Sequence, residues 1–291
     1  MEIIRRHIES QVLSLTGLAI GGVDYENPPG DPGLFGPDSV CWRVHGDFTS
    51  MMVGGISAIL LQALHPLALA GVWDHSNFRD DLLGRLRRTG QFISGTVFGS
   101  QADAHRLIER VRAIHLKVTG HAPDGRPYAA YDPELLTWVH VSEVSSFLKA
   151  HLRYLNQALP GPEQDRYFDE VARIAEALGA RNVPHSRQEV DDYFEAVRPQ
   201  LFCDERSREI VRILFEAPAP SRLTKPFGAL MMRAGVELLP DWASGMLDLN
   251  QSERERQLIR MGVRRIAPVL RWAVRSGSVH RARRRVGLPI R

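Results

Sequence analysis

Cysteine is scarce in this chain, since only Cys41 and Cys203 occur among its 291 residues. The two stand far apart, and neither belongs to a closely spaced pair. Small secreted domains and zinc ribbons both depend on several cysteines at defined spacings. The sequence therefore excludes a disulfide framework and a cysteine-based zinc site.

A secretion signal and an unbroken membrane-spanning run are also missing. The chain begins MEIIRRHIES, which has no apolar core, so we expect a cytoplasmic protein. The most apolar stretch, residues 51–73, contains Gln62, His65 and Pro66. The proline should end or kink a helix near Leu64. We expect a central helix buried on all sides, with membrane insertion or surface association as the alternative.

The common catalytic signatures are absent as well. The sequence has no G-x-S-x-G elbow, no phosphate-binding P-loop, no H-E-x-x-H pair and no dinucleotide-binding glycine run after a strand. The inward-facing Glu-x-x-His pairs of di-iron bundles are missing too. The sequence therefore gives no motif-based reason to expect a hydrolase, a nucleotide-binding protein or a di-iron protein.

Charge of one sign is not concentrated over most of the chain. The 37 Lys and Arg and 34 Asp and Glu residues are intermixed and give a net charge of +3, with a pI near 9.1. Nucleic acid is therefore not an expected partner. Residues 276–291 are the exception, because they are strongly basic and such a run can bind nucleic acid or anionic lipid. They lack interleaved aromatic residues, so we interpret them as a solvated tail.

Helical signals dominate what is present, and alternating strand patterns are almost absent. The predicted helix boundaries are Thr49 or Ser50 before the buried run, Ser100 and Gly120 around one helix, Asp132 before Pro133, a stop near Gly179, and a capping box of Ser186 with Glu189. The sequence predicts an all-α fold of about ten helices, in one domain that covers residues 1–291.

One position breaks the amphipathic pattern of residues 100–120. Apolar residues recur at three-and-four spacing from Ala104 to Val118, and His115 occupies a place in that series. His105, by contrast, belongs to the polar side. A buried imidazole needs partners for both ring nitrogens, or one partner and a metal. His115 is therefore either a core histidine bonded to a carbonyl or carboxylate, or a ligand.

Polar side chains border the apolar face of the preceding helix. Arg85, Arg88 and Thr89 lie along one side at steps of three and four residues. The arginines either reach water, pair with acids such as Asp80 and Asp81, or meet an anion in a pocket. That anion could be a carboxylate, a phosphate, a haem propionate or a reduced oxygen species.

Two more histidines stand in apolar surroundings. His65 follows the buried run directly, and His140 adjoins Trp138 and Val139. Each alone is readily explained as a core or helix-end group. Together with the arginines, they predict a polar pocket inside a helical bundle, where cofactors are commonly held.

Four segments in this order resemble the rubber-oxygenase (latex-clearing protein) and MpaB-type oxygenase family. They are LLQALHPLALAGVWDHSNF, RLRRTGQFISGTVFG, RVRAIHLKVTG and GRPYAAYDPELLTWVH. The similarity covers roughly residues 45–150 and continues more weakly toward the C-terminus. Characterised members are all-α proteins whose globin-like helical core holds b-type haem, so the resemblance implies the same fold and cofactor here.

The resemblance also implies roles for individual residues. His115, in the H-x-x-V-x-G element, would be the proximal haem ligand, and Arg85, Arg88 and Thr89 align with the distal R-x-x-K-T element of rubber oxygenases. Arg88 replaces the lysine of that element, and an arginine cannot supply the same point-charge contact. The segment QALHPLALAG lacks the glutamate that rubber enzymes place there as a proposed base. Cleavage of rubber itself is therefore not expected.

Two function classes follow. The first is a haem b-dependent oxygenase or oxidase that acts with O2 or peroxide on a small, largely apolar molecule. Its predicted site residues are Arg85, Arg88 and Thr89 for catalysis, His115 as iron ligand, and Arg85, His65 and His140 for cofactor binding. The second is a non-catalytic protein of the same fold that holds an anionic small ligand at the arginines. A third interpretation, binding of an anionic surface, rests on residues 276–291 alone.

Overall fold

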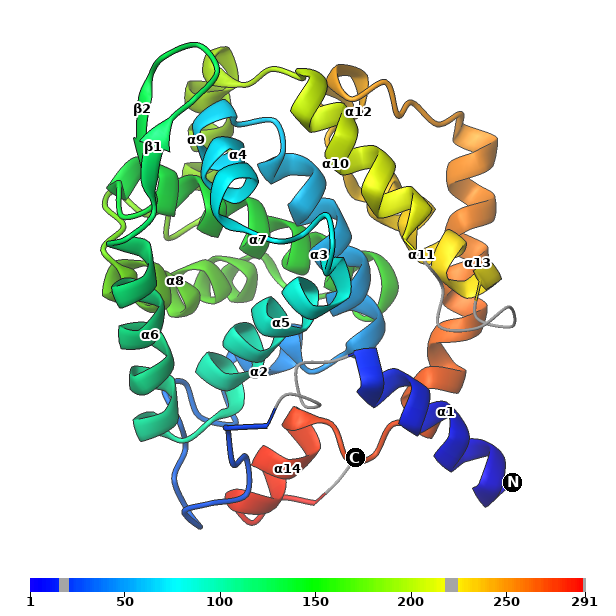
Figure 1. The fold of residues 1–291 in the computed structure, drawn as a ribbon. Helices are drawn as coiled ribbons and strands as arrows, with labels where there is room; N and C mark the ends of the chain where they lie inside the picture. The colour runs from blue at the N-terminus through cyan, green and yellow to red at the C-terminus, as the bar shows by residue number, and fades with distance from the viewer. Residues whose placement is uncertain (16–20, 218–224, 290–291) are drawn as a thin grey trace.

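The computed structural model describes residues 1–15, 21–217 and 225–289. It is 69% helical, with 14 helices and one two-stranded sheet in the described residues, so the predicted all-α single-domain fold is confirmed. In chain order the elements are α1 (Glu2–Leu15), α2 (Val40–His45), α3 (Phe48–Gln62), α4 (Pro66–His75), α5 (Leu82–Phe98), α6 (Gln101–His115), β1 (Thr119–His121), β2 (Pro127–Ala129), α7 (Pro133–Tyr154), α8 (Gly161–Leu178), α9 (Arg187–Val197), α10 (Glu205–Glu216), α11 (Lys225–Leu238), α12 (Asp241–Met246), α13 (Glu253–Ala273) and α14 (Ser278–Arg285) (Figure 1).

Helix α3 lies at the centre of the molecule, packed against α7 and α11 (Figure 1). Pro66 begins α4, and the axes of α3 and α4 differ by 105°, so the predicted break near Leu64 is confirmed. In the described part of the chain, no single helix has the length and apolarity to cross a bilayer; only the bent α3–α4 pair meets that test on length and composition.

The start of α3 differs from the prediction of Thr49 or Ser50 as its N-cap. Asp47 caps the helix instead, and its carboxylate accepts a hydrogen bond from the Ser50 backbone N–H at 3.0 Å. The same carboxylate pairs with Arg271 of α13 at 2.7 Å. A charged cap with a guanidinium partner thus ties the central helix to α13.

Other predicted helix boundaries are confirmed. The Ser100 side chain caps α6, Asp132 caps α7 with Pro133 in the first turn, and Gly179 ends α8 in the left-handed region at φ 108°. Ser186 caps α9, but the Glu189 carboxylate accepts from the backbone N–H of His185 rather than from that of Ser186. The return bond of the capping box is therefore displaced by one residue.

Helix α6 ends at His115, so the prediction that it continues to Gly120 is wrong. The chain turns there because β1 pairs with β2, opposite Tyr128 at Gly120. Val118 packs with Tyr128 and Ala70, so its apolar side chain is partly buried although it lies outside the helix. A Cβ at Gly120 would lie 2.5 Å from the Tyr128 hydroxyl, so this glycine provides clearance in the hairpin.

The close approach of α3 to α7 depends on Gly54. A Cβ built there would lie 2.9 Å from Cδ1 of Phe147 and 3.0 Å from the Ser146 carbonyl oxygen. Both helices would have to move apart to accommodate a methyl group. Gly54 thus sets the spacing between two helices that also form the wall of the cavity described below.

We expect Gly54→Ala to lower the free energy of unfolding by about 1–3 kcal/mol, because the new methyl group overpacks a helix contact. Gly245→Ala is the matched control, since no atom lies within 4 Å of the added Cβ. It should raise stability by about 0.5–1 kcal/mol through the lower entropy of the unfolded chain. Urea unfolding of both variants measures the difference, and equal stabilities would contradict the assigned role of Gly54.

The basic C-terminal segment is not a solvated tail over residues 278–285, so that prediction is corrected. These residues form α14, which packs against α5, and the Arg285 side chain is buried. Its guanidinium donates to the backbone carbonyls of Phe98, Gly99, Tyr25 and Asp31 at 2.8–3.2 Å. The arginine binds to the main chain because these buried carbonyls need donors.

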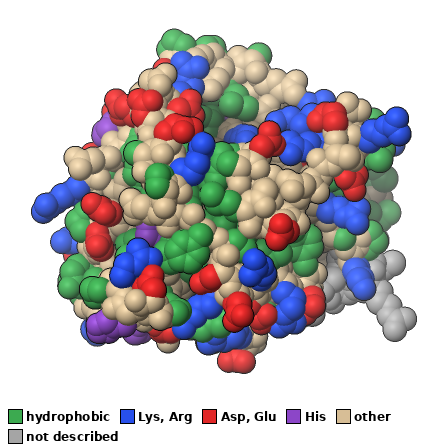
Figure 2. Space-filling view, turned by 90° about the horizontal axis from the view of Figure 1, so that it is seen from above, with side chains coloured by type: hydrophobic (Ala, Val, Ile, Leu, Met, Phe, Trp, Pro, Cys, Tyr) green, Lys and Arg blue, Asp and Glu red, His purple; other side chains and the backbone are tan. Residues whose placement is uncertain are grey.

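The surface charges are mixed, as the composition indicates. Figure 2 shows one face of the molecule on which acidic, basic and hydrophobic side chains are interspersed. Exposed ion pairs such as Arg43–Glu163 and Arg187–Asp165 neutralise part of the positive charge. This face does not carry the continuous basic stripe that a nucleic-acid surface requires.

Candidate functional site

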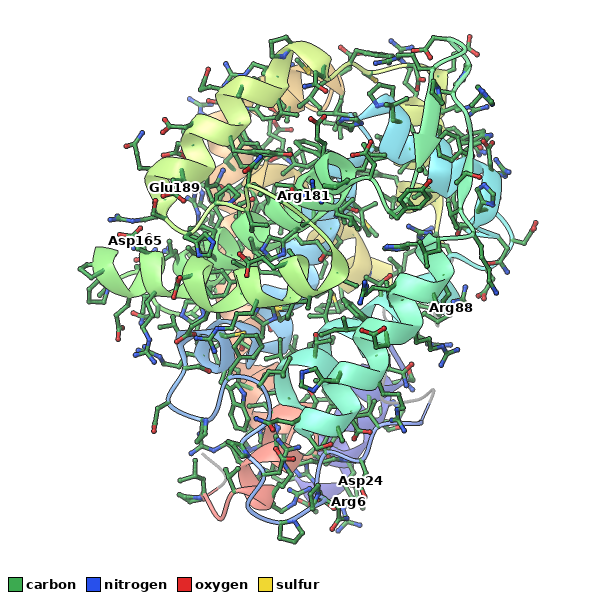
Figure 3. The ribbon with its side chains drawn as sticks, turned by 90° about the vertical axis from the view of Figure 1, so that its left-hand side faces the viewer. Arg6, Asp24, Arg88, Asp165, Arg181 and Glu189 are labelled. Carbon is green, nitrogen blue, oxygen red and sulfur yellow. The ribbon has the colours of Figure 1, made fainter. Side chains whose placement is uncertain are left out.

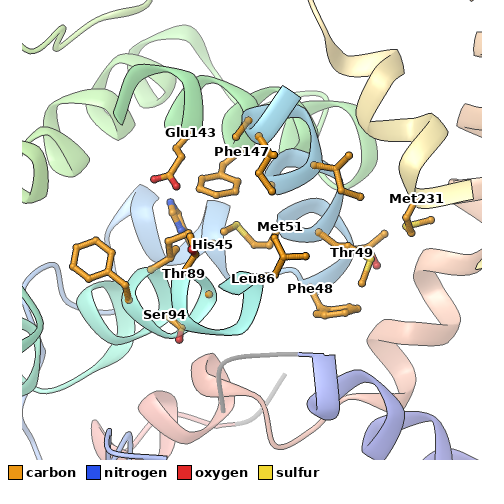
Figure 4. Close-up of a pocket in the computed structure, with 18 of the residues that line it drawn as sticks. His45, Phe48, Thr49, Met51, Leu86, Thr89, Ser94, Glu143, Phe147 and Met231 are labelled. Atoms are coloured by element: carbon orange, nitrogen blue, oxygen red, sulfur yellow. The ribbon is translucent and has the colours of Figure 1, made fainter. Parts of the chain in front are cut away.

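A cavity of about 2440 Å³ runs through the helical bundle. Its walls come from α3, α5, α6 and α7 together with α1, α11 and α13. Figure 4 shows apolar side chains of the lining, among them Met51, Leu86 and Phe147. Pockets for small molecules usually measure about 300–1,000 Å³. This space is large enough for a sizeable cofactor together with a second molecule.

His115 lies on the wall of this cavity at the last residue of α6. Its Nδ1 atom is buried, and within the described residues neither a carbonyl nor a carboxylate bonds to it. Burial lowers the pKa of the imidazole, so the ring is neutral at pH 7. A neutral imidazole is the form that binds a metal ion. The structure thus lacks the partner that a core histidine at this position would need.

Arg85 lines the same cavity and is half-buried. It donates to the Ser76 hydroxyl at 2.8 Å, and no carboxylate of the described residues lies within ion-pair distance of it. Burial, followed by the nearby charge of Arg88, lowers its pKa. A guanidinium in such a position is stabilised by an anion that enters the cavity.

Arg88 and Thr89 border the cavity where it opens to solvent. Arg88 is exposed and pairs with Asp81 at 3.4 Å, which is one of the alternatives that the sequence left open (Figure 3). It also donates to the Asn77 side chain at 3.3 Å. Thr89 is exposed toward the cavity beside Leu86 (Figure 4). Of the predicted distal residues, Arg85 is the most enclosed.

The structure separates the two other predicted histidines. His65 does not line the cavity; it caps α4, accepting from the Ala68 backbone N–H at 3.4 Å, and its ring lies 5.8 Å from that of Trp138. His140 does line the cavity, and its buried Nε2 has no partner among the described residues. Burial lowers its pKa to about 4, so it is neutral at pH 7. The geometry brings His140, and not His65, into the same cavity as His115.

Glu143 of α7 is a cavity residue that the sequence analysis missed. Burial raises the pKa of its carboxyl to about 7, against the opposing effects of the Arg85 charge and a hydrogen bond from Gln62. A signal was present, because Leu136, His140, Glu143 and Phe147 recur at three-and-four spacing and all line the cavity. A carboxyl on an apolar helix face breaks the pattern in the same way as His115 does.

His45 of α2 is a second residue that the sequence analysis missed. Its Nε2 is bonded to the Tyr167 hydroxyl at 2.9 Å, while its Nδ1 is buried without a partner in the described part of the chain. Burial lowers its pKa to about 3. His45, His140 and Glu143 all line a recess of about 30 Å³ in the cavity wall, and Figure 4 shows the Glu143 carboxyl directed toward the His45 ring. Two neutral imidazoles and a titratable carboxyl therefore share one small, mainly apolar recess.

The described residues contain no group of three His, Cys, Asp or Glu side chains that could hold a metal ion by themselves. A haem iron has a different requirement, because the porphyrin supplies four nitrogens and the protein adds one axial imidazole. The unpartnered Nδ1 of neutral His115, the guanidinium of Arg85 and the large apolar cavity meet that requirement. The residues present fit a haem.

The described residues form an all-α protein around a large, mainly apolar cavity that opens to solvent. Residues 42–272 match the family described as "ER-bound oxygenase mpaB/B'/Rubber oxygenase, catalytic domain". The chain belongs to this family, and the match extends well beyond residues 45–150, where the sequence resemblance is strongest.

Two curated proteins are similar to this chain. They are the "uncharacterized protein" Mb2261 of Mycobacterium bovis and the "uncharacterized protein" Rv2237 of Mycobacterium tuberculosis. Each is 27% identical over 205 residues, which cover 67% of this chain and 78% of the relative. No solved structure matches the chain. The family that residues 42–272 match is described as one of oxygenases, and this description supports an oxidoreductase role.

Proposed function

We propose that this protein is a haem b-dependent oxygenase or oxidase that acts on a small, largely apolar molecule with O2 or peroxide. The observation that carries the proposal is His115, a neutral imidazole with an unpartnered buried nitrogen on the wall of a large apolar cavity. Its place in an oxygenase family supports the reaction class.

His115 would hold the haem iron through its imidazole, and Arg85 would bind a propionate or another anionic group of the cofactor. When bound, the haem supplies the redox chemistry with O2 or peroxide that amino-acid side chains cannot perform. Arg88 and Thr89 stand nearer the solvent-exposed margin, where they can orient an entering molecule.

The remaining cavity residues bind the substrate and move protons. Met51, Leu86 and Phe147 provide an apolar surface that excludes water from the site. The Glu143 carboxyl, with a pKa of about 7, can hold a proton or release it near neutral pH. The neutral rings of His45 and His140 line the same recess and can accept a hydrogen bond from the protonated carboxyl through a bridging water.

The direct test is the visible spectrum of the full chain produced with a supply of haem. We expect a Soret band and about one haem per chain, because one axial histidine serves one cavity. O2 consumption in the presence of a reductant and apolar candidate substrates then tests catalysis. A protein that takes up no haem during expression or by reconstitution would sink the proposal.

Arg85 supports a second candidate function, a non-catalytic protein that holds an anionic small ligand. Its guanidinium faces the cavity without an ion-paired carboxylate in the described residues. Thermal unfolding distinguishes the two functions, because a ligand that binds the folded state raises its stability. Stabilisation by carboxylates or phosphate, without stabilisation by haem, would favour this alternative.

A further inference from the structure

The outward face of α13 carries large apolar side chains that nothing in the described protein covers. Leu258, Met261, Val269 and Trp272 are 64%, 48%, 47% and 36% exposed. Successive members of this set are 3, 8 and 3 residues apart in the sequence. At 3.6 residues per turn, this spacing places all four side chains on one side of the helix. They form a stripe along most of α13, which we call the α13 stripe.

From Leu258 onward the stripe is bordered by positive charge, whereas the acids of α13, Glu253 and Glu255, lie in its first turn. Residues 258–275 contain five arginines and no aspartate or glutamate. Arg260 and Arg271 turn inward and pair with Glu237 and Asp47, which fixes the orientation of the helix. Arg264 and Arg265 are exposed and have no ion-pair partner among the described residues. The outward face is therefore both apolar and cationic.

The large cavity reaches the surface beside this stripe. Trp272 belongs to the exposed stripe and also lines the cavity, whose lining there includes Leu270 of α13, Val274 directly after it and Phe227 of α11. An apolar molecule that lies against the outside of α13 is thus adjacent to an apolar route inward. Tryptophan is enriched at the interface between a bilayer and water, where its ring is partly immersed.

We propose that the α13 stripe docks the protein on an anionic lipid bilayer, so that the cavity opens toward the membrane surface. An amphipathic surface with tryptophan and leucine between arginines binds such a membrane through both apolar burial and electrostatic attraction. The charge on this face selects the bilayer as the occupant, since the exposed and unpaired Arg264 and Arg265 complement anionic headgroups and would repel the same face of a second copy. Docking through α13 does not depend on haem.

The test is co-sedimentation of the full chain with vesicles of phosphatidylcholine alone or with about 30 mol % phosphatidylglycerol. We expect binding to the anionic vesicles only. The double charge reversal Arg264→Glu with Arg265→Glu should weaken that binding at least ~10-fold, since each basic residue near the surface contributes about 1 kcal/mol. Leu258→Ser with Met261→Ser should also weaken it, because these side chains are the most exposed of the stripe.

The matched control is Arg110→Glu with Arg181→Glu, which changes the net charge equally. Both residues are exposed and unpaired among the described residues. Arg110 belongs to α6, which lies on the side of the molecule away from α13 (Figure 1), and Figure 3 labels Arg181 on that side. This control should bind vesicles nearly as the wild type does. Equal loss in the control, or no vesicle binding by the wild type, would overturn the proposal. A dimer that Leu258→Ser with Met261→Ser abolishes, without vesicle binding, would assign the stripe to a second copy instead.

The haem spectrum and the vesicle assay fail independently. A protein that binds anionic vesicles but no haem retains the docking surface and loses the proposed oxygenase function. A protein that shows a Soret band but does not bind vesicles would support the proposed function and contradict the proposed docking surface. Circular dichroism of each variant, compared with that of the wild type, confirms that the helices remain folded.

Discussion

His115→Ala should abolish the Soret band of the protein expressed with haem, with a loss of haem affinity of about 100-fold or more. Removal of a residue that only hydrogen-bonds to a metal ligand typically lowers metal affinity about 10–100-fold. Removal of the ligand itself should lower the affinity further. The neutral ring and unpartnered Nδ1 leave this histidine available to bind iron, and the resemblance of its H-x-x-V-x-G segment selects it over His140 and His45. Titration with haem, followed by absorbance, measures the change.

His105→Ala is the matched control for this experiment. It makes the same substitution on the same helix, but His105 is exposed and lies outside the cavity lining. Its spectrum should match that of the wild type. If His115→Ala retains an unshifted band, the axial ligand is another residue, and His140→Ala and His45→Ala are the variants to compare next, because both have an unpartnered ring nitrogen.

Glu143→Gln should raise the free energy of unfolding at about pH 8 by up to about 3 kcal/mol relative to the wild type. Burial raises the pKa of this carboxyl from its ordinary 4.5 to about 7 in the folded protein. Between these two pH values the folded state binds more protons than the unfolded state does, so wild-type stability falls as the pH rises. The uncharged glutamine lacks this fall and keeps an amide that can bond to Gln62. Urea unfolding from about pH 5 to about pH 8 measures the difference between the two proteins.

Glu134→Gln serves as the control for Glu143→Gln. Glu134 stands on the same helix but in its exposed first turn. Its variant should parallel the wild type over the whole pH range. Infrared spectra at about pH 6 add an independent readout, since the carbonyl stretch of the protonated Glu143 carboxyl should be absent in Glu143→Gln. A pH dependence that survives this substitution unchanged would show that another group titrates.

The sequence predicted the fold class and the helix boundaries well where local chemistry decides them. The caps at Ser100 and Asp132 and the break at Pro66 follow from side chains that act on their own backbone. The predicted end of α6 was wrong because a tertiary contact determines where the helix stops. That contact is the packing of Val118 on Tyr128 in the hairpin. Local patterns carry no information about which distant residue such a side chain will meet.

The candidate site was predicted in part for a similar reason. His115, Arg85 and His140 stood out because they interrupt apolar helix faces, and the structure brings all three to one cavity. His65 interrupts a face equally but serves as a helix cap. Glu143 and His45 reach the cavity from α7 and α2, and only the packing of α2 against α5, α7 and α8 shows that they share a recess.

The anchoring of Arg285 has a consequence for where the autonomous folding unit begins and ends. The family match covers residues 42–272, but the guanidinium of Arg285 binds carbonyls of Tyr25 and Asp31, which lie before that span, as well as those of Phe98 and Gly99 within it. A chain trimmed to the homologous boundaries would leave buried acceptors of α5 and its following loop without donors. The residues that match the family are therefore fewer than the residues that the fold needs. The segments before and after the match hold the two ends of the protein together through Arg285.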